Sequence, residues 1–121
     1  MNPNLKQKWI DALLSDKYKQ GLNRLRTYDN RFCCLGALCN IINPNGWVQN
    51  RWGDYVFRCE SDLMEKVLSP AFRTATKLSN SYHATLTRLN DTETRSFKEI
   101  ADWIKNNIEE SSDDPDVTVS A

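Results

Sequence analysis

Four cysteines and one histidine are the residues whose chemistry could define a site: Cys33, Cys34, Cys39, Cys59 and His83. Zinc sites use four such ligands, commonly in paired C-x-x-C units. Here the local spacing is C-C-x4-C, and adjacent or i, i+5 cysteines on one helix rarely converge on one metal. We therefore expect reduced, buried thiols and no cofactor, and we keep zinc as the weaker alternative.

A nucleophilic thiol is a second hypothesis for the same residues. Cys33 or Cys34 would lie at the start of a buried helix, where the macrodipole lowers the pKa of a thiol. His83 would then act as the base, and Asn90 or Asp91 would orient it, in the chain order of papain-like enzymes. The flanking residues match no protease signature. The alternative is a loop histidine and a turn that leads into the last helix.

The segment 17–31 is the most basic part of the chain, and it supplies Arg24, Arg26 and Arg31. Tyr28 lies within it, and Trp52 follows in a predicted hairpin. Arginines beside aromatic side chains can hold phosphates and stack bases, so the segment predicts a nucleotide or nucleic-acid site. The alternative is a solvated, salt-bridged surface, because the chain has no helix-turn-helix or RNP sequence.

The length of 121 residues predicts one domain, and charge divides it in two parts. Residues 109–121 contain five acidic and no basic residues, which leaves 16 basic against 11 acidic residues in the rest. We expect a globular domain over 1–108 and an acidic, disordered tail over 109–121. The tail would improve solubility or, as the alternative, shield a basic surface. Without a signal pattern or a long apolar run, we expect no membrane contact and a cytoplasmic protein.

Three segments follow the helical period. Apolar residues recur at helical spacing over 3–15, an almost unbroken apolar run covers 32–42, and a further apolar stripe covers 96–108. Ser96 and Glu99 match the capping box S-x-x-E at the start of the last stripe. The run 32–42 predicts a central helix buried on most of its faces.

Between these helices, aromatic and β-branched residues over 47–60 predict a β-hairpin. We expect a short helix over 62–68 that Pro70 ends, a loop over 70–81 and one or two helical turns over 82–89. The fold class is therefore mainly α (α+β): a compact helical domain with a buried central helix and one small β-hairpin.

Five motifs occur in order along this predicted domain: Trp9, the lysine–glutamine–glycine of 19–21, the CCLG of 33–36, the LND of 89–91 and the SFKEIA of 96–101. Together they resemble a family of small uncharacterised proteins encoded by tailed phages, prophages and some bacteria. The resemblance implies a phage or prophage origin and a compact fold. It implies no activity and supplies no catalytic residues.

The leading functional hypothesis is a non-enzymatic phage accessory protein that binds a host protein in the cytoplasm of a bacterial host cell. Small size, the lack of a catalytic motif and the aromatic residues of the hairpin favour it. The alternative is a nucleotide or nucleic-acid binder, a ligand sponge, that uses the Arg24–Arg31 segment. A cysteine-dependent enzyme is the third hypothesis. A virion component and any oligomeric state remain open.

Overall fold

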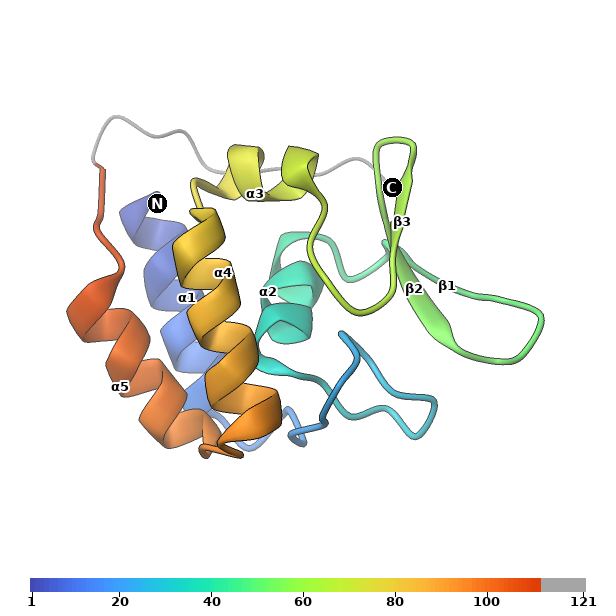
Figure 1. Cartoon of the computed structure of the whole chain (residues 1–121), viewed down its shortest axis with the longest axis horizontal. Helices are drawn as coiled ribbons and strands as arrows, with labels where there is room; N and C mark the ends of the chain where they lie inside the picture. Colours follow the sequence, from blue (N-terminus) through green and yellow to red (C-terminus); the bar gives the residue numbers. More distant parts are fainter. Residues whose placement is uncertain (112–121) are drawn as a thin grey trace.

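The structure is a computed structural model that describes residues 1–111 of the chain. In order, its elements are α1 (Pro3–Leu14), α2 (Cys34–Ile42), β1 (Trp47–Gln49), β2 (Tyr55–Cys59), β3 (Asp62–Met64), α3 (Pro70–Thr76), α4 (Asn80–Thr87), the π-helical segment η1 (Arg88–Thr92) and α5 (Phe97–Asn107). Helices α1, α4 and α5 lie at one end, the small sheet lies at the other, and α2 lies between them (Figure 1). The predicted α+β class is confirmed. Most of the predicted acidic tail, 112–121, lies outside the described residues.

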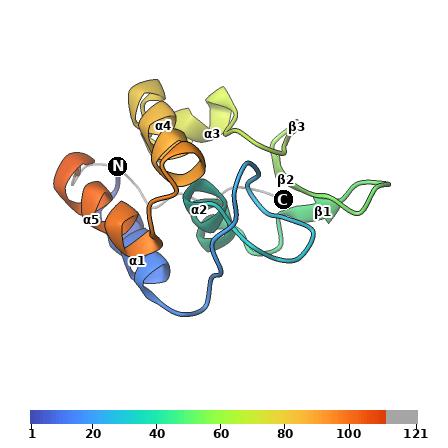
Figure 2. The same ribbon diagram turned by 60° about the horizontal axis from the view of Figure 1, so that its bottom comes forward.

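The two terminal helices form as the sequence predicts, and they pack against each other (Figure 2). The side chain of Asn2 caps α1 by accepting a hydrogen bond from the Leu5 N–H at 3.0 Å. At the start of α5, Ser96 and Glu99 form both bonds of the capping box. None of the helices within residues 1–111 is long and apolar enough to cross a membrane.

A buried lysine ties α1 to the end of α5. Lys6 Nζ donates to the carbonyls of Ile108 at 2.6 Å and Lys105 at 3.2 Å, and it forms an ion pair with Glu110 at 3.3 Å. The last carbonyls of a helix have no partners within it and carry partial negative charge. An ammonium group therefore satisfies these carbonyls and stabilises this end of α5.

The central helix α2 is buried over most of its length, as predicted. The indole N–H of Trp9 donates to the Cys34 carbonyl at 2.9 Å and so attaches α1 to the start of α2. On another side, Gly36 lies directly against the backbone of Leu25. A Cβ atom at position 36 would lie 1.7 Å from the Leu25 carbonyl oxygen, so only glycine fits there.

The predicted hairpin is confirmed, but a third strand extends it. Strands β1, β2 and β3 pair in that order and antiparallel, with Trp47 opposite Phe57 and Phe57 opposite Met64. The helix predicted over 62–68 is therefore wrong. Glu60 adopts a left-handed conformation with φ 55°, which turns the chain back so that β3 pairs with β2 and buries Met64.

The loop predicted over 70–81 is also wrong, because α3 and the start of α4 occupy it. Pro70 begins α3 instead of ending a helix, since proline suits the first helical position. Ser69 and Ser79 cap the two helices, and their side chains accept from the N–H groups of Phe72 at 3.2 Å and Tyr82 at 3.1 Å. Buried Phe72 fixes α3 on the core.

Candidate functional site

All four cysteines are free and buried, as predicted. Burial raises the pKa of Cys33 to about 12 and the pKa of Cys34 well above its ordinary value. The expectation that the helix terminus lowers the pKa of these thiols is therefore wrong. Cys33 does cap α2, with its sulfur 3.3 Å from the Gly36 nitrogen, but loss of solvent outweighs that bond.

The other members of the hypothetical triad have separate roles. His83 Nε2 accepts from the Leu68 N–H at 3.2 Å, and burial lowers the pKa of this imidazole, with a smaller contribution from Arg73. Asn90 lies beside Cys34, but its side chain accepts a hydrogen bond from the Cys34 backbone N–H and not from the thiol. Within residues 1–111, Asn90 makes no hydrogen bond with His83. Within the same residues, no three His, Cys, Asp or Glu side chains are grouped to hold a metal ion.

Instead, three of the sequence motifs meet at the side chain of Asn90, which is 1% exposed. Its Oδ1 accepts from the Cys34 N–H at 3.2 Å and from Gln20 Nε2 at 3.0 Å. Its Nδ2 donates to the Gly21 carbonyl at 2.9 Å and to Asp91 Oδ1 at 2.8 Å. We call these five residues the Asn90 cluster. Apart from the order of the motifs, no sequence signal indicates that they meet.

The Asn90 cluster continues into the chain on either side of it. Asp91 Oδ1 also accepts from the Asn23 N–H at 3.0 Å, and Gln20 Nε2 donates to the Arg95 carbonyl at 2.6 Å. The Asn90 side chain uses both its donors and its acceptor. A buried polar group with all its bonds made is typical of a structural role. The cluster holds the segment after residue 19 against α2 and η1.

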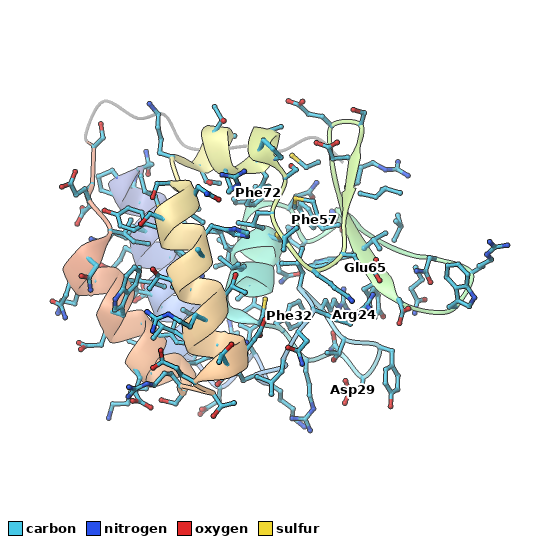
Figure 3. The ribbon with its side chains drawn as sticks, viewed as in Figure 1. Arg24, Asp29, Phe32, Phe57, Glu65 and Phe72 are labelled. Carbon is cyan, nitrogen blue, oxygen red and sulfur yellow. The ribbon has the colours of Figure 1, made fainter. Side chains whose placement is uncertain are left out.

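Two of the three predicted ligand-binding arginines have carboxylate partners. Arg24 Nη2 lies 2.5 Å from Glu65 Oε1 and 3.7 Å from Asp54 Oδ2, and Figure 3 shows Arg24 beside Glu65. Arg31 Nε lies 3.2 Å from Asp29 Oδ2. The carboxylates of these pairs offset part of the positive charge of the segment 17–31.

The third arginine, Arg26, stacks on aromatic rings. Its guanidinium carbon lies 3.8 Å from the ring centre of Tyr55, 5.1 Å from that of Phe32 and 5.4 Å from that of Trp47. Burial lowers its pKa. Cation–π contacts of this kind stabilise a fold. Arg26 therefore joins the basic segment to the sheet, and its stacked face is already occupied.

The two aromatic residues of the predicted ligand site are exposed. Tyr28 is 77% exposed in the turn before Phe32, and Trp52 is 73% exposed in the loop between β1 and β2. Both loops project at the sheet end of the molecule in Figures 1 and 2. Leu63 and Val67, on and after β3, are also exposed. Leu63 and Val67 are not among the predicted site residues, because the sequence predicts a helix over 62–68.

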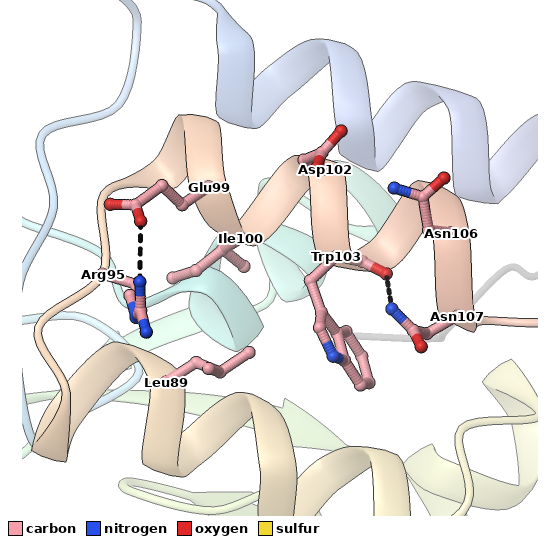
Figure 4. Close-up of a pocket in the computed structure, with 8 residues that line it drawn as sticks. All are labelled: Leu89, Arg95, Glu99, Ile100, Asp102, Trp103, Asn106 and Asn107. Carbon is pink, nitrogen blue, oxygen red and sulfur yellow. Dashed lines mark hydrogen bonds and ion pairs between the residues drawn. The ribbon is translucent and has the colours of Figure 1, made fainter.

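Hollows flank α5 on both sides. One, of about 340 Å³, is lined by Leu89, Arg95, Glu99, Ile100, Asp102, Trp103, Asn106 and Asn107 (Figure 4). The other, of about 540 Å³, is lined by Ile10, Leu14, Lys98, Glu99, Ala101, Asp102 and Lys105. In the first, Arg95 pairs with Glu99 at 3.0 Å on the helix surface. Neither hollow contains a cysteine or histidine, so neither combines a thiol nucleophile with an imidazole base.

The buried thiols predict a slow alkylation reaction. With a pKa of about 12 for Cys33, roughly 10⁻⁴ of this thiol is ionised at pH 8. We expect iodoacetamide to label Cys33 in the folded protein more than about a thousandfold more slowly than free cysteine, the other buried thiols more slowly than free cysteine as well, and all four thiols rapidly in urea. Intact mass measures the labelling. One thiol that reacts as fast as free cysteine in the folded protein would contradict the structural role.

Comparison with known protein families places the chain in a described family. A family model described as a domain of unknown function, DUF8296, covers residues 1–108. No curated protein and no solved structure matches the chain. The match thus extends over all five motifs, including the three that meet at Asn90.

Proposed function

This chain belongs to the DUF8296 family, whose function is unknown, and we propose that it is a non-enzymatic accessory protein that acts by binding another protein. The supporting observation is the pair of exposed aromatic side chains, Tyr28 and Trp52, at the sheet end. The motifs resemble those of phage and prophage proteins. The proposal therefore includes a phage origin and a host protein as the partner, in the cytoplasm of a bacterial cell.

Tyrosine and tryptophan contribute strongly to protein interfaces because they bury a large area with few rotatable bonds. Local hydrogen bonds hold both loops in shape. The Trp52 N–H donates to Asn50 Oδ1 at 3.0 Å, and the Thr27 N–H donates to the Arg31 carbonyl at 2.8 Å. Loops ordered before binding lose less entropy when a partner docks. Tyr28 and Trp52 are therefore placed to act as anchors.

The surroundings of the potentially catalytic residues favour a binding function over a catalytic one. The thiols are buried and protonated, and Asn90 is fully bonded within the fold. His83 accepts a backbone hydrogen bond and lacks a thiol partner in residues 1–111. Among residues 1–111, four of the six exposed large apolar or aromatic side chains, Tyr28, Trp52, Leu63 and Val67, lie near the sheet.

Replacing both anchors should remove binding without unfolding the protein. We expect Tyr28→Ala with Trp52→Ala to lower recovery of a specific host protein at least tenfold, since each anchor contributes about 1–2 kcal/mol or more. The measurement is quantitative mass spectrometry of a pulldown from nuclease-treated lysate. Leu14→Ser, at an exposed apolar position on the far helical end, is the matched control and should bind normally. Equal recovery by all three proteins would contradict the proposal.

The alternative, a nucleotide or nucleic-acid binder that uses Arg24–Arg31, has less support because Arg24 and Arg31 are ion-paired. One observation favours it: Arg51 stacks on exposed Trp52 at 4.6 Å, a platform on which a base could stack. The pulldown, repeated with and without nuclease treatment of the lysate, separates the two proposals. Recovery that requires nucleic acid, and falls steeply with salt, would favour the alternative.

A further inference from the structure

The only histidine of the chain joins two parts of the fold through one hydrogen bond. His83 lies in the first half of α4, and its Nε2 accepts from the backbone N–H of Leu68 at 3.2 Å. A neutral imidazole accepts through one ring nitrogen and donates through the other, so the proton of this ring is on Nδ1. An imidazolium has two donors and no acceptor. Protonation therefore abolishes the bond and leaves two N–H groups facing each other.

The partner of His83 belongs to a segment without regular structure. Residues 65–69 connect β3 to α3 and form neither helix nor strand. Another hydrogen bond from a distant part of the chain reaches the start of this segment, where the Glu65 carbonyl accepts from the Leu25 N–H at 3.0 Å. Further along the segment, the side chain of Val67 is exposed and that of Leu68 is buried. The bond to His83 therefore fixes the backbone at the point where the segment enters the core.

The surroundings of His83 favour its neutral form. Burial lowers the pKa of His83, and the positive charge of Arg73 on α3 lowers it further. In the segment 65–69, Glu65 is ion-paired with an arginine and Lys66 is exposed. On α2, which packs against α4, the thiol of Cys34 stays protonated because its pKa is raised. Within residues 1–111, no carboxylate pairs with His83, so no negative charge there stabilises an added proton.

We propose that His83 is a pH-sensitive latch, whose neutral ring holds the segment 65–69 on α4 and whose protonation releases the segment. The imidazole is half-buried, so a proton reaches it from solvent without unfolding of the domain. Release frees the backbone beside exposed Val67 and so changes the apolar surface next to β3. The latch involves neither of the proposed anchors, Tyr28 and Trp52.

The direction of the pH dependence follows from the two pKa values of the ring. In the released state the ring is solvated and its pKa is about 6.5, whereas in the closed state its pKa is lower. The closed state is therefore fully favoured above about pH 6.5. As the pH falls below that value, the ratio of released to closed forms rises, because the released form binds a proton more tightly. The rise ends below the pKa of the closed state.

Hydrogen exchange of the Leu68 amide measures the released population. The protection of this amide is its intrinsic exchange rate at each pH divided by the observed rate. We expect this protection to fall about tenfold between about pH 7.5 and about pH 5. The ¹⁵N signals of the His83 ring should show an unprotonated Nε2 at the higher pH, as the hydrogen bond requires.

His83→Gln is the matched control, because the amide oxygen of glutamine can accept from the Leu68 N–H and does not titrate. Protection of Leu68 in this variant, whatever its level, should be the same at both pH values. The Leu5 N–H, which donates to the Asn2 side chain at 3.0 Å on α1, should keep its protection in both proteins. Unchanged protection of Leu68 in the wild-type protein at about pH 5 would overturn the proposal. An equal loss of protection in His83→Gln would overturn it as well, since no imidazole is present there.

Discussion

Gly36→Ala should destabilise the protein by about 4 kcal/mol or more, at the upper end of single substitutions. The added Cβ would lie 1.7 Å from the Leu25 carbonyl oxygen and 2.6 Å from its carbonyl carbon. Alanine in a helix interior normally gains about 1 kcal/mol over glycine. Overpacking against backbone exceeds that gain, because a backbone cannot rotate away as a side chain can.

The backbone of Leu25 has little freedom to move. Its N–H donates to the Glu65 carbonyl at 3.0 Å, and its carbonyl accepts from the Cys33 N–H at 3.2 Å. Its side chain is fully buried. To make room for a methyl group at position 36, α2 and this segment must separate, which breaks these bonds or opens the core. This is the physical reason for the large expected effect.

Urea denaturation measures the change, with Gly53→Ala as the matched control. Gly53 has φ 84°, but a Cβ added there would meet no atom of a more distant residue within 4 Å. The cost at position 53 is therefore limited to about 1–2 kcal/mol of backbone strain. We expect Gly36→Ala to shift the midpoint much further or to abolish the cooperative transition. If the two variants have similar midpoints, the contact between Gly36 and Leu25 is not rigid.

Local signals in the sequence predicted the elements that are stabilised locally. The first helix, α2 and α5 have clear apolar periods, and the capping box at Ser96 and Glu99 identified the start of α5. Strand β3 has no comparable signal. It is three residues long, and it exists because Glu60 turns the chain and Met64 pairs with Phe57. Such a strand depends on its neighbour in space, which periodicity does not report.

The failure to predict helix α3 has a different cause, because the sequence signals for this helix are present. Ser69 followed by Pro70 is the usual order of an N-cap and a first helical position. Pro70 also suits the end of a preceding helix, and the incorrect prediction of a helix over 62–68 leads to the prediction of a loop over 70–81. The short length of α3 also leaves a weak apolar period, in which Phe72 supplies most of the buried surface.

The chemistry at the candidate sites depended on partners far away in the sequence. The sequence identified Arg24 as a cation, but Glu65, which pairs with it, is 41 residues away. It placed Cys33 at a helix start correctly, yet burial, a property of the whole fold, sets the pKa of that thiol. Side-chain type and local position were predictable, whereas the ion pairing of Arg24 and the pKa of Cys33 were not.

The motifs on which the resemblance rests thus have a structural explanation. Gln20 and Gly21, Cys34, and Asn90 and Asp91 come from three motifs and meet in one buried cluster. Gly36 belongs to the same CCLG motif as Cys34, and it allows α2 to pack directly against the backbone of Leu25. Residues placed for these reasons specify the fold, so the function is better sought on the surface that they leave free.

Asn90→Ala tests that conclusion, and we expect it to destabilise the protein by about 3–5 kcal/mol. It leaves the buried N–H of Cys34 and the carbonyl of Gly21 without partners, at about 1–3 kcal/mol each, and a small cavity adds to the cost. Gln20→Ala removes one donor at the edge of the cluster and should cost about 1 kcal/mol. Urea denaturation again gives the difference.

Asn90→Asp separates hydrogen bonding from packing, because it keeps the size of the side chain and one acceptor for the Cys34 N–H. It loses the donor to Gly21 and places a carboxylate beside Asp91 in a buried position. Burial and the neighbouring charge should raise the pKa of the new carboxyl above its unfolded value. The variant is then least stable, relative to wild type, above the raised pKa, and it recovers as the pH falls through that value. Asn90→Ala should show no such recovery between pH 7 and about pH 5. A pH-independent deficit in both variants would mean that the Asn90 cluster is open to solvent and does not hold the three motifs together.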